Sequence, residues 1–129
     1  MKKIILTLLI LVSMIFSAQA RNLESLMIVA TDGQFLGTFE NKFSSDSIYN
    51  TFGDYGSKFS STSIFNQFGD YGSDFSTLSP FNSFSVEGPW IVDEMGNKYG
   101  RLSINKFAYG VTQETLKLAL ELKAIRDSK

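Results

Sequence analysis

The sequence KFSSDSIYNTFGDYGS, residues 42–57, is followed directly by KFSSTSIFNQFGDYGS, residues 58–73. The two segments are identical at 13 of 16 positions, and residues 74–89, DFSTLSPFNSFSVEGP, form a third and more divergent copy. A short unit that recurs at a fixed period indicates one structural element used several times, because a single unit cannot bury its own apolar side chains. The sequence therefore predicts three stacked repeats at residues 42–89.

Serine and glycine positions within the repeat predict its local conformation. Position seven is isoleucine in the first two copies and Pro80 in the third, and proline is tolerated in the first turn of a helix. We therefore expect one helical turn per repeat, capped by the serine that precedes position seven. These caps are Ser47, Ser63 and Ser79. Gly53 and Gly69 follow, where a chain leaving such a turn often needs a positive φ.

Aromatic side chains recur at four positions of the repeat. Position two and position eleven hold Phe43, Phe52, Phe59, Phe68, Phe75 and Phe84, and position eight holds Tyr49, Phe65 and Phe81. Regularly spaced rings usually serve packing, so we expect all of these to form the core. Tyr55 and Tyr71, at position fourteen, differ because the third repeat replaces them with Glu87 while it keeps the phenylalanines. They are the candidate ligand-binding residues.

A second internal duplication flanks the repeats, at residues 28–43 and 90–107. Both segments contain the residues IV, two glycines and NKF in the same order. Apolar residues surround a turn at Asp32-Gly33 in the first segment and a turn near Gly96 in the second, a pattern typical of β-hairpins. Gly37 and Gly100 lie in the return strands and indicate a bulge or a close backbone approach. The two hairpins predict a small antiparallel sheet.

The C-terminal segment, residues 112–127, has the pattern of an amphipathic helix with Thr112 as its cap. Its predicted apolar stripe consists of Val111, Leu118, Leu122 and Ile125, with Leu116 and Leu120 beside it. We expect this stripe to dock on its own domain rather than on a partner. The predicted fold class is therefore α+β, with residues 21–129 forming one small domain.

The N-terminal residues 1–20 have the features of an export signal. Lys2 and Lys3 precede a mostly apolar stretch of 13 residues, and small residues at Ala18 and Ala20 fit the site that a signal peptidase cleaves. This stretch is shorter than the ~18 residues that span a bilayer, so we expect no membrane span after cleavage. Removal of the two lysines leaves 10 basic and 13 acidic residues, a net charge of about −3, which does not favour nucleic acid as a partner.

The order of these segments resembles a group of small exported bacterial proteins. A hairpin that ends in NKF precedes copies of S-x-S-I-x-N-x-F-G-x-Y-G-S, and a second hairpin follows them. The resemblance covers about residues 28–107, whereas the third repeat and the C-terminal segment depart from the repeat pattern. It implies a periplasmic or secreted location and transfers no catalytic or binding residue.

The composition excludes several kinds of catalytic chemistry. The chain has neither histidine nor cysteine, so it cannot form a typical zinc site, a cysteine nucleophile or a Ser-His triad. Asp54 and Asp70 occupy equivalent places in adjacent repeats and could share a calcium ion, but their spacing matches no known calcium loop, and solvated turn aspartates are the better interpretation. We expect no cofactor and no enzymatic activity.

Two classes of function remain compatible with this sequence. The first is a non-catalytic binding module of the bacterial envelope or exterior, whose partner is a glycan, a peptide or a protein. The second is a structural protein whose repeats self-associate, because aromatic and small polar units at a fixed period can stack between chains. An enzyme of unrecognised type is a third choice.

The export signal yields a direct prediction. Cleavage after Ala20 should leave Arg21 as the N-terminal residue of the exported protein, because the small residues that the peptidase requires end there. Mass spectrometry of the exported protein measures this terminus. A full-length species that stays with membranes would contradict the prediction.

Overall fold

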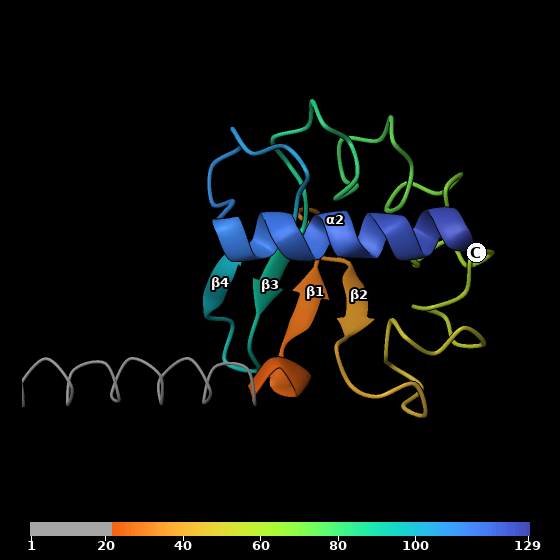
Figure 1. Cartoon of the computed structure of the whole chain (residues 1–129). Coiled ribbons are helices and arrows are strands. Elements are labelled where there is room, and N and C mark those ends of the chain that lie inside the picture. The colour runs from red at the N-terminus through yellow and green to blue at the C-terminus, as the bar shows by residue number, and fades with distance from the viewer. Residues whose placement is uncertain (1–21) are drawn as a thin grey trace, which may run out of the picture.

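The computed structural model describes residues 22–129 and shows an α+β protein, which confirms the predicted class. The export signal predicted at residues 1–20 lies outside the described residues. The elements are the 3-10 helix η1 (Asn22–Ser25), the strands β1 (Met27–Val29), β2 (Phe35–Thr38), β3 (Trp90–Val92) and β4 (Lys98–Arg101), and the helix α2 (Gln113–Ser128). Figure 1 shows α2 lying across the sheet, with the repeats to the right of the sheet and above it in this view.

The four strands form one antiparallel sheet in the order β2-β1-β3-β4. Ile28 of β1 lies opposite Ile91 of β3 at the centre, and the outer strands place Gly37 opposite Ile28 and Gly100 opposite Ile91. The register shifts after each of these outer pairs, at corresponding places in the two halves. The duplicated sequence thus builds two equivalent halves that meet at the isoleucine pair.

Gly37 and Gly100 allow other elements to approach the sheet closely. A Cβ atom on Gly37 would lie 2.8 Å from side-chain atoms of Ile48 and Tyr55 in the first repeat. A Cβ atom on Gly100 would lie 2.8 Å from the Thr115 methyl carbon of α2. Both glycines also have positive φ values, 114° and 153°. Equivalent glycines therefore receive a repeat on one half of the sheet and the helix on the other.

The repeats contain no helical turn, so the expectation of one per copy is wrong. In the second repeat every third backbone N–H group donates a hydrogen bond to the carbonyl group three residues earlier. These donors are Ser60, Ser63, Asn66, Gly69 and Gly72. Each repeat is therefore a run of β-turns, and five steps of three residues plus one further residue make up the 16-residue period.

Serine and asparagine side chains stabilise these turns. The Ser63 hydroxyl accepts the Phe65 N–H at 3.1 Å, and the Asn66 Oδ1 atom accepts the Phe68 N–H at 3.0 Å. The Asn66 amide also donates to the Ser60 carbonyl at 3.0 Å and closes the coil. Such local side-chain bonds compete with helix formation, and this explains why the serines cap β-turns instead of helices.

The glycine prediction was also wrong in its position. Gly53 and Gly69 do not have positive φ values, and the third repeat has Ser85 at the equivalent place. The constrained glycine is three residues later, because a Cβ atom on Gly72 would lie 2.2 Å from the Asn66 carbonyl oxygen. The third repeat keeps this glycine as Gly88. Close backbone packing, and not backbone conformation, therefore requires glycine here.

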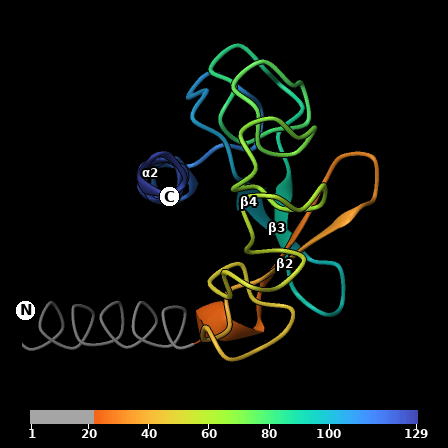
Figure 2. The ribbon, with the colours of Figure 1, turned by 90° about the vertical axis from the view of Figure 1, so that its right-hand side faces the viewer.

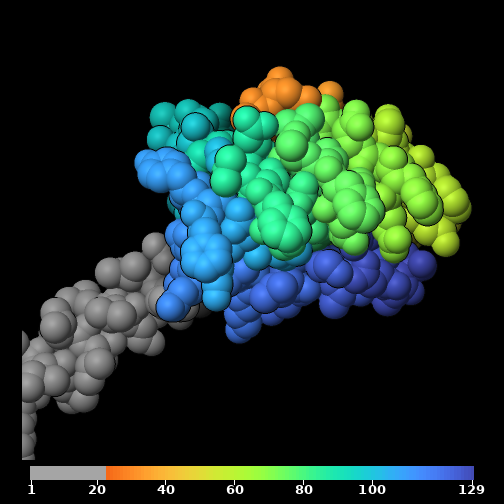
Figure 3. All heavy atoms as spheres, turned by 90° about the horizontal axis from the view of Figure 1, so that it is seen from above, coloured from red at the N-terminus to blue at the C-terminus, as the bar shows by residue number. Residues whose placement is uncertain are grey.

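The repeats lie side by side along α2. Figure 3 shows them in chain order, from residues near 60 at one end of the molecule to residues near 90 at the other, with α2 running alongside. In Figure 2, which looks along α2, the repeats and the sheet lie on the same side of the helix. Neighbouring repeats are joined where Thr62 donates to the Asp54 carbonyl at 3.0 Å and Ser76 donates to the Asp70 carbonyl.

Helix α2 begins as predicted and buries only part of the predicted stripe: Leu122 is buried and Leu118 packs against the core. The Thr112 hydroxyl accepts the Thr115 N–H at 3.1 Å and caps the helix. The buried residues are Thr115, Ala119, Leu122 and Arg126. Leu120 and Ile125, expected in or beside the buried stripe, are exposed. The face is set by Thr115, which must lie against Gly100, and by Arg126, which donates to the Gly72 carbonyl at 2.6 Å.

The hydrophobic core lies between the sheet, the repeats and α2. It combines apolar residues of the sheet, the helix and neighbouring loops with isoleucines and phenylalanines of the repeats. Its members are Ile28, Ala30, Leu36, Phe39, Ile48, Ile64, Phe65, Phe81, Ile91, Leu102, Ala119 and Leu122. The sheet, the repeats and the helix thus contribute to one core.

The two glycines of the second repeat should respond differently to substitution. Gly72→Ala should lower the free energy of unfolding by about 3 kcal/mol, because its methyl group would overlap backbone oxygens of Asn66 and Ile64. Gly69→Ala should cost less than about 1 kcal/mol, because the nearest atoms belong to the Asn66 side chain at 3.2 Å. Urea unfolding of the two variants measures the difference. Equal losses would contradict the turn geometry described here.

Candidate binding surface

Seven phenylalanines of the described chain are almost fully exposed, so the prediction that positions two and eleven form the core is wrong. Their side chains are 82 to 97% accessible to solvent. They are Phe43, Phe52, Phe59, Phe68, Phe75, Phe84 and Phe107. We call this set the phenylalanine row. Exposed apolar groups of this number and regularity mark interaction surfaces more often than chance.

One local motif places every ring of the row. Each phenylalanine is the third residue of a turn that starts with asparagine or serine, whose side chain accepts the phenylalanine N–H. Phe107 belongs to the row because Asn105 accepts its N–H at 3.1 Å, although it lies outside the repeats. The pattern [NS]-x-F occurs at every ring of the row, but it also occurs at the buried Phe65 and Phe81, so it locates the capped turns and does not by itself distinguish exposed from buried rings.

The same turn chemistry buries the aromatic residues at position eight. Phe65 and Phe81 are each about 1% exposed and belong to the core, which confirms the prediction for these two rings. Tyr49, the equivalent residue of the first repeat, is only partly buried and packs against the core. Each repeat thus alternates turns that face the core with turns that face solvent.

Two grooves lie between exposed rings of the row, and we name them the second groove and the third groove after the repeats that contain them. The second groove, in the second repeat, has Phe59 and Phe68 among its lining residues, together with the buried Phe65, and a volume of about 330 Å³. The third groove, in the third repeat, is lined by the equivalent Phe75, Phe84 and Phe81, with a volume of about 470 Å³. Residues from the C-terminal half of α2 complete both grooves.

The second groove is positively charged. The Lys129 ammonium lies 4.8 Å from the centre of the Phe65 ring and donates to the Gly56 carbonyl at 3.3 Å, and the Lys58 ammonium lies 5.2 Å from the Phe59 ring. Burial, and then the nearby Lys58, lower the pKa of Lys129. Among residues 22–129, neither lysine forms a salt bridge.

The charges beside the third groove are compensated. Asp74 forms a salt bridge of 2.7 Å with Arg126, and Lys123 forms one of 2.9 Å with Asp127. Arg126 also pairs with Asp127 at 2.8 Å and stacks its guanidinium group 4.8 Å from the Phe81 ring centre. The third groove therefore presents apolar walls without a free charge of either sign.

The candidate residues Tyr55 and Tyr71 lie outside both grooves. Both are half-buried and pack against the core. The Tyr55 ring meets Phe35 edge to face at 4.9 Å. The Tyr71 hydroxyl donates to Asp32 at 2.7 Å, and this bond, followed by burial and by the charges of Asp32 and Asp70, raises the pKa of Tyr71 to about 12. Their role in binding a ligand stays a prediction.

The aspartates considered for calcium lie in exposed turns. Asp54 and Asp70 each use the backbone carbonyl to bind the next repeat, through Thr62 and Ser76 respectively. Within residues 22–129 there is no cluster of three or more acidic residues that could hold a metal ion.

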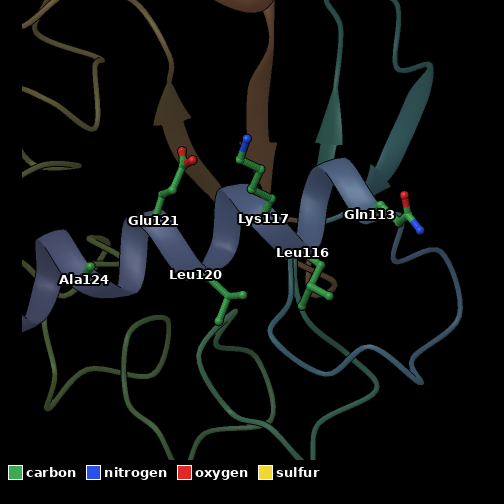
Figure 4. A pocket seen from close by; sticks show the side chains of 6 residues that line it. All are labelled: Gln113, Leu116, Lys117, Leu120, Glu121 and Ala124. Carbon is green, nitrogen blue, oxygen red and sulfur yellow. The ribbon is translucent and has the colours of Figure 1, made fainter.

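A shallow apolar groove runs along the outer side of α2. Figure 4 shows Leu116 and Leu120 pointing from the opposite side of the helix to Lys117 and Glu121. Leu120 is about half exposed, and Ala124 continues the same lining toward the C-terminus. These residues belong to the stripe that the sequence led us to expect in the core, or lie next to it.

Comparisons with protein-family models, with curated proteins and with solved structures found no match to this chain. Between residues 22 and 129 no helix has the length and apolar character needed to cross a membrane.

The exposure of the row can be tested by paired substitutions. Phe59→Ala and Phe68→Ala should each change the free energy of unfolding by less than about 0.5 kcal/mol, because both rings already contact water. Phe65→Ala should cost about 3 to 5 kcal/mol, because it removes a fully buried ring between them. Thermal and urea unfolding measure these values. A large loss in either of the first two variants would place those rings in the core.

Proposed function

We propose that this chain is an exported, non-catalytic binding module whose contact surface is the phenylalanine row. One observation carries the proposal: seven rings at equivalent turn positions are 82 to 97% exposed. Exposure at seven equivalent positions shows that these rings do not serve the packing of the core. The bacterial envelope or exterior as the location rests on the export signal and on the resemblance stated above.

The chemistry of the row favours an apolar partner. Phenylalanine has no hydroxyl or N–H group to orient a sugar, so it gains free energy mainly by excluding water. Burying one such ring contributes on the order of 1.5 to 3 kcal/mol, and several rings together could support specific association. A peptide or protein with apolar side chains therefore fits the row better than an envelope glycan.

Self-association of the repeats is the second candidate, because every copy of the chain carries the same apolar row. Lysines stand beside three of the rings, with ammonium groups 5.2 to 5.4 Å from the ring centres. These residues are Lys42, Lys58 and Lys106. Two rows facing each other would bring these like charges together, and this disfavours stacking between copies.

A triple variant tests the proposed surface. Phe52→Ser, Phe68→Ser and Phe84→Ser together should reduce the capture of envelope proteins and peptides by immobilised mature protein at least tenfold, because three exposed rings are lost while the turn chemistry stays. The matched control is Met95→Ser, which removes an equally exposed apolar side chain from the turn between β3 and β4. Quantitative mass spectrometry of the captured material, with circular dichroism of each variant, measures the outcome.

Two results would contradict the proposal. Unchanged capture by the triple variant, with loss in Tyr55→Phe and Tyr71→Phe, would place the contact at the tyrosines. Concentration-dependent assembly in sedimentation experiments, abolished by the same triple variant, would show that the row binds a second copy of this chain.

A further inference from the structure

The second and third grooves are built from equivalent repeat residues but differ in charge. Phenylalanines at positions two, eight and eleven line both, and position one is Lys58 in the second groove and Asp74 in the third. Arg126 of α2 and Lys129, which follows the helix, also line the second groove, and Lys123 of α2 lines the third. The two sites therefore offer the same apolar walls to a ligand and distinguish its charged groups.

We propose that the second groove binds an acidic side chain, flanked by apolar residues, of an extended peptide that lies along the phenylalanine row. This inference rests on the proposed function and specifies its partner. The third groove then accepts a neutral apolar side chain of the same peptide. The row would thus recognise an order of side chains, acidic and then apolar, in addition to general hydrophobicity.

Charge complementarity carries the argument. Lys58 and Lys129 both line the second groove, and neither is paired with a carboxylate among the described residues. Their mutual repulsion contributes to the lowered pKa of Lys129, and an incoming carboxylate would relieve it. Arg126 cannot supply this attraction to the same degree, because Asp74 and Asp127 already occupy its guanidinium group.

The shape and the total charge favour a peptide over a lipid surface. The grooves are concave, separated by one repeat, and of a volume suited to single side chains or small ligands. The exported chain carries a net charge of about −3, which repels an anionic membrane as a whole even though one groove is basic. A peptide can place one carboxylate in that groove and keep the rest of its length neutral.

Two model peptides test the inference on the mature protein. The probes are acetyl-Leu-Phe-Glu-Leu-amide and its Gln counterpart, titrated while the backbone amide signals of residues 58–73 and 74–89 are followed by NMR. The Glu peptide should bind at the second groove roughly twofold to fivefold more tightly than the Gln peptide, as expected for one exposed ion pair. Lys58→Gln should abolish this preference. Lys42→Gln should leave it intact, because Lys42 has the same position in the first repeat but lines neither groove.

A charge reversal makes the test reciprocal. Lys58→Asp alone, which leaves the Asp74–Arg126 salt bridge in place, should make the Gln peptide bind at the second groove more tightly than the Glu peptide. Equal binding of the Glu and Gln peptides at the row would overturn the acidic preference and leave the proposed binding surface in place. Binding of neither peptide would also overturn it, and the triple serine variant then decides independently whether the row is a contact surface at all.

Discussion

The fold depends on one constraint: the 48 residues of the repeats contain no helix and no paired strand of the sheet, yet their backbone N–H groups need hydrogen-bond partners. Serine and asparagine at steps of three residues meet this need, because each side chain accepts an N–H two residues further along. Turn bonds between backbone groups pair further N–H groups, such as those of Ser60, Ser63 and Gly72. In the second repeat serine or asparagine stands at the first four corners and glycine at Gly69 and Gly72, and the shape of the coil and the direction of its rings depend on the capped corners.

This constraint explains how a domain without cysteine can hold many phenylalanine rings in water. The core-facing turns bury Ile64 and Phe65 between the sheet and α2, and this packing anchors each coil. The solvent-facing turns need no packing of their own, because their side-chain caps fix the backbone. The phenylalanines on these turns thus lie outside the core, with most of their surface in water.

The sequence predicts the parts of this fold whose signals are local. The duplicated segments around Gly37 and Gly100, the Thr112 cap and the 16-residue period all correspond to features of the structure. The conformation of the repeat was misjudged because a serine before isoleucine or proline starts a β-turn as readily as a helix. Phe65 and Phe68 have the same side-chain cap, yet Phe65 is buried and Phe68 is exposed. Tertiary packing, which the local sequence does not encode, therefore determines which ring is buried.

Asp74 connects the assembly of the fold to the difference between the grooves. At this position the first two repeats have lysine, and the third has the aspartate that pairs with the buried Arg126 of α2. The pair holds the end of the helix against the repeats, where Arg126 also reaches the Gly72 carbonyl. Asp74 also replaces the lysine that an exact third copy of the repeat would have placed in the third groove. Identical repeats could not distinguish one part of a ligand from another, and the substitution that anchors the helix breaks that equivalence.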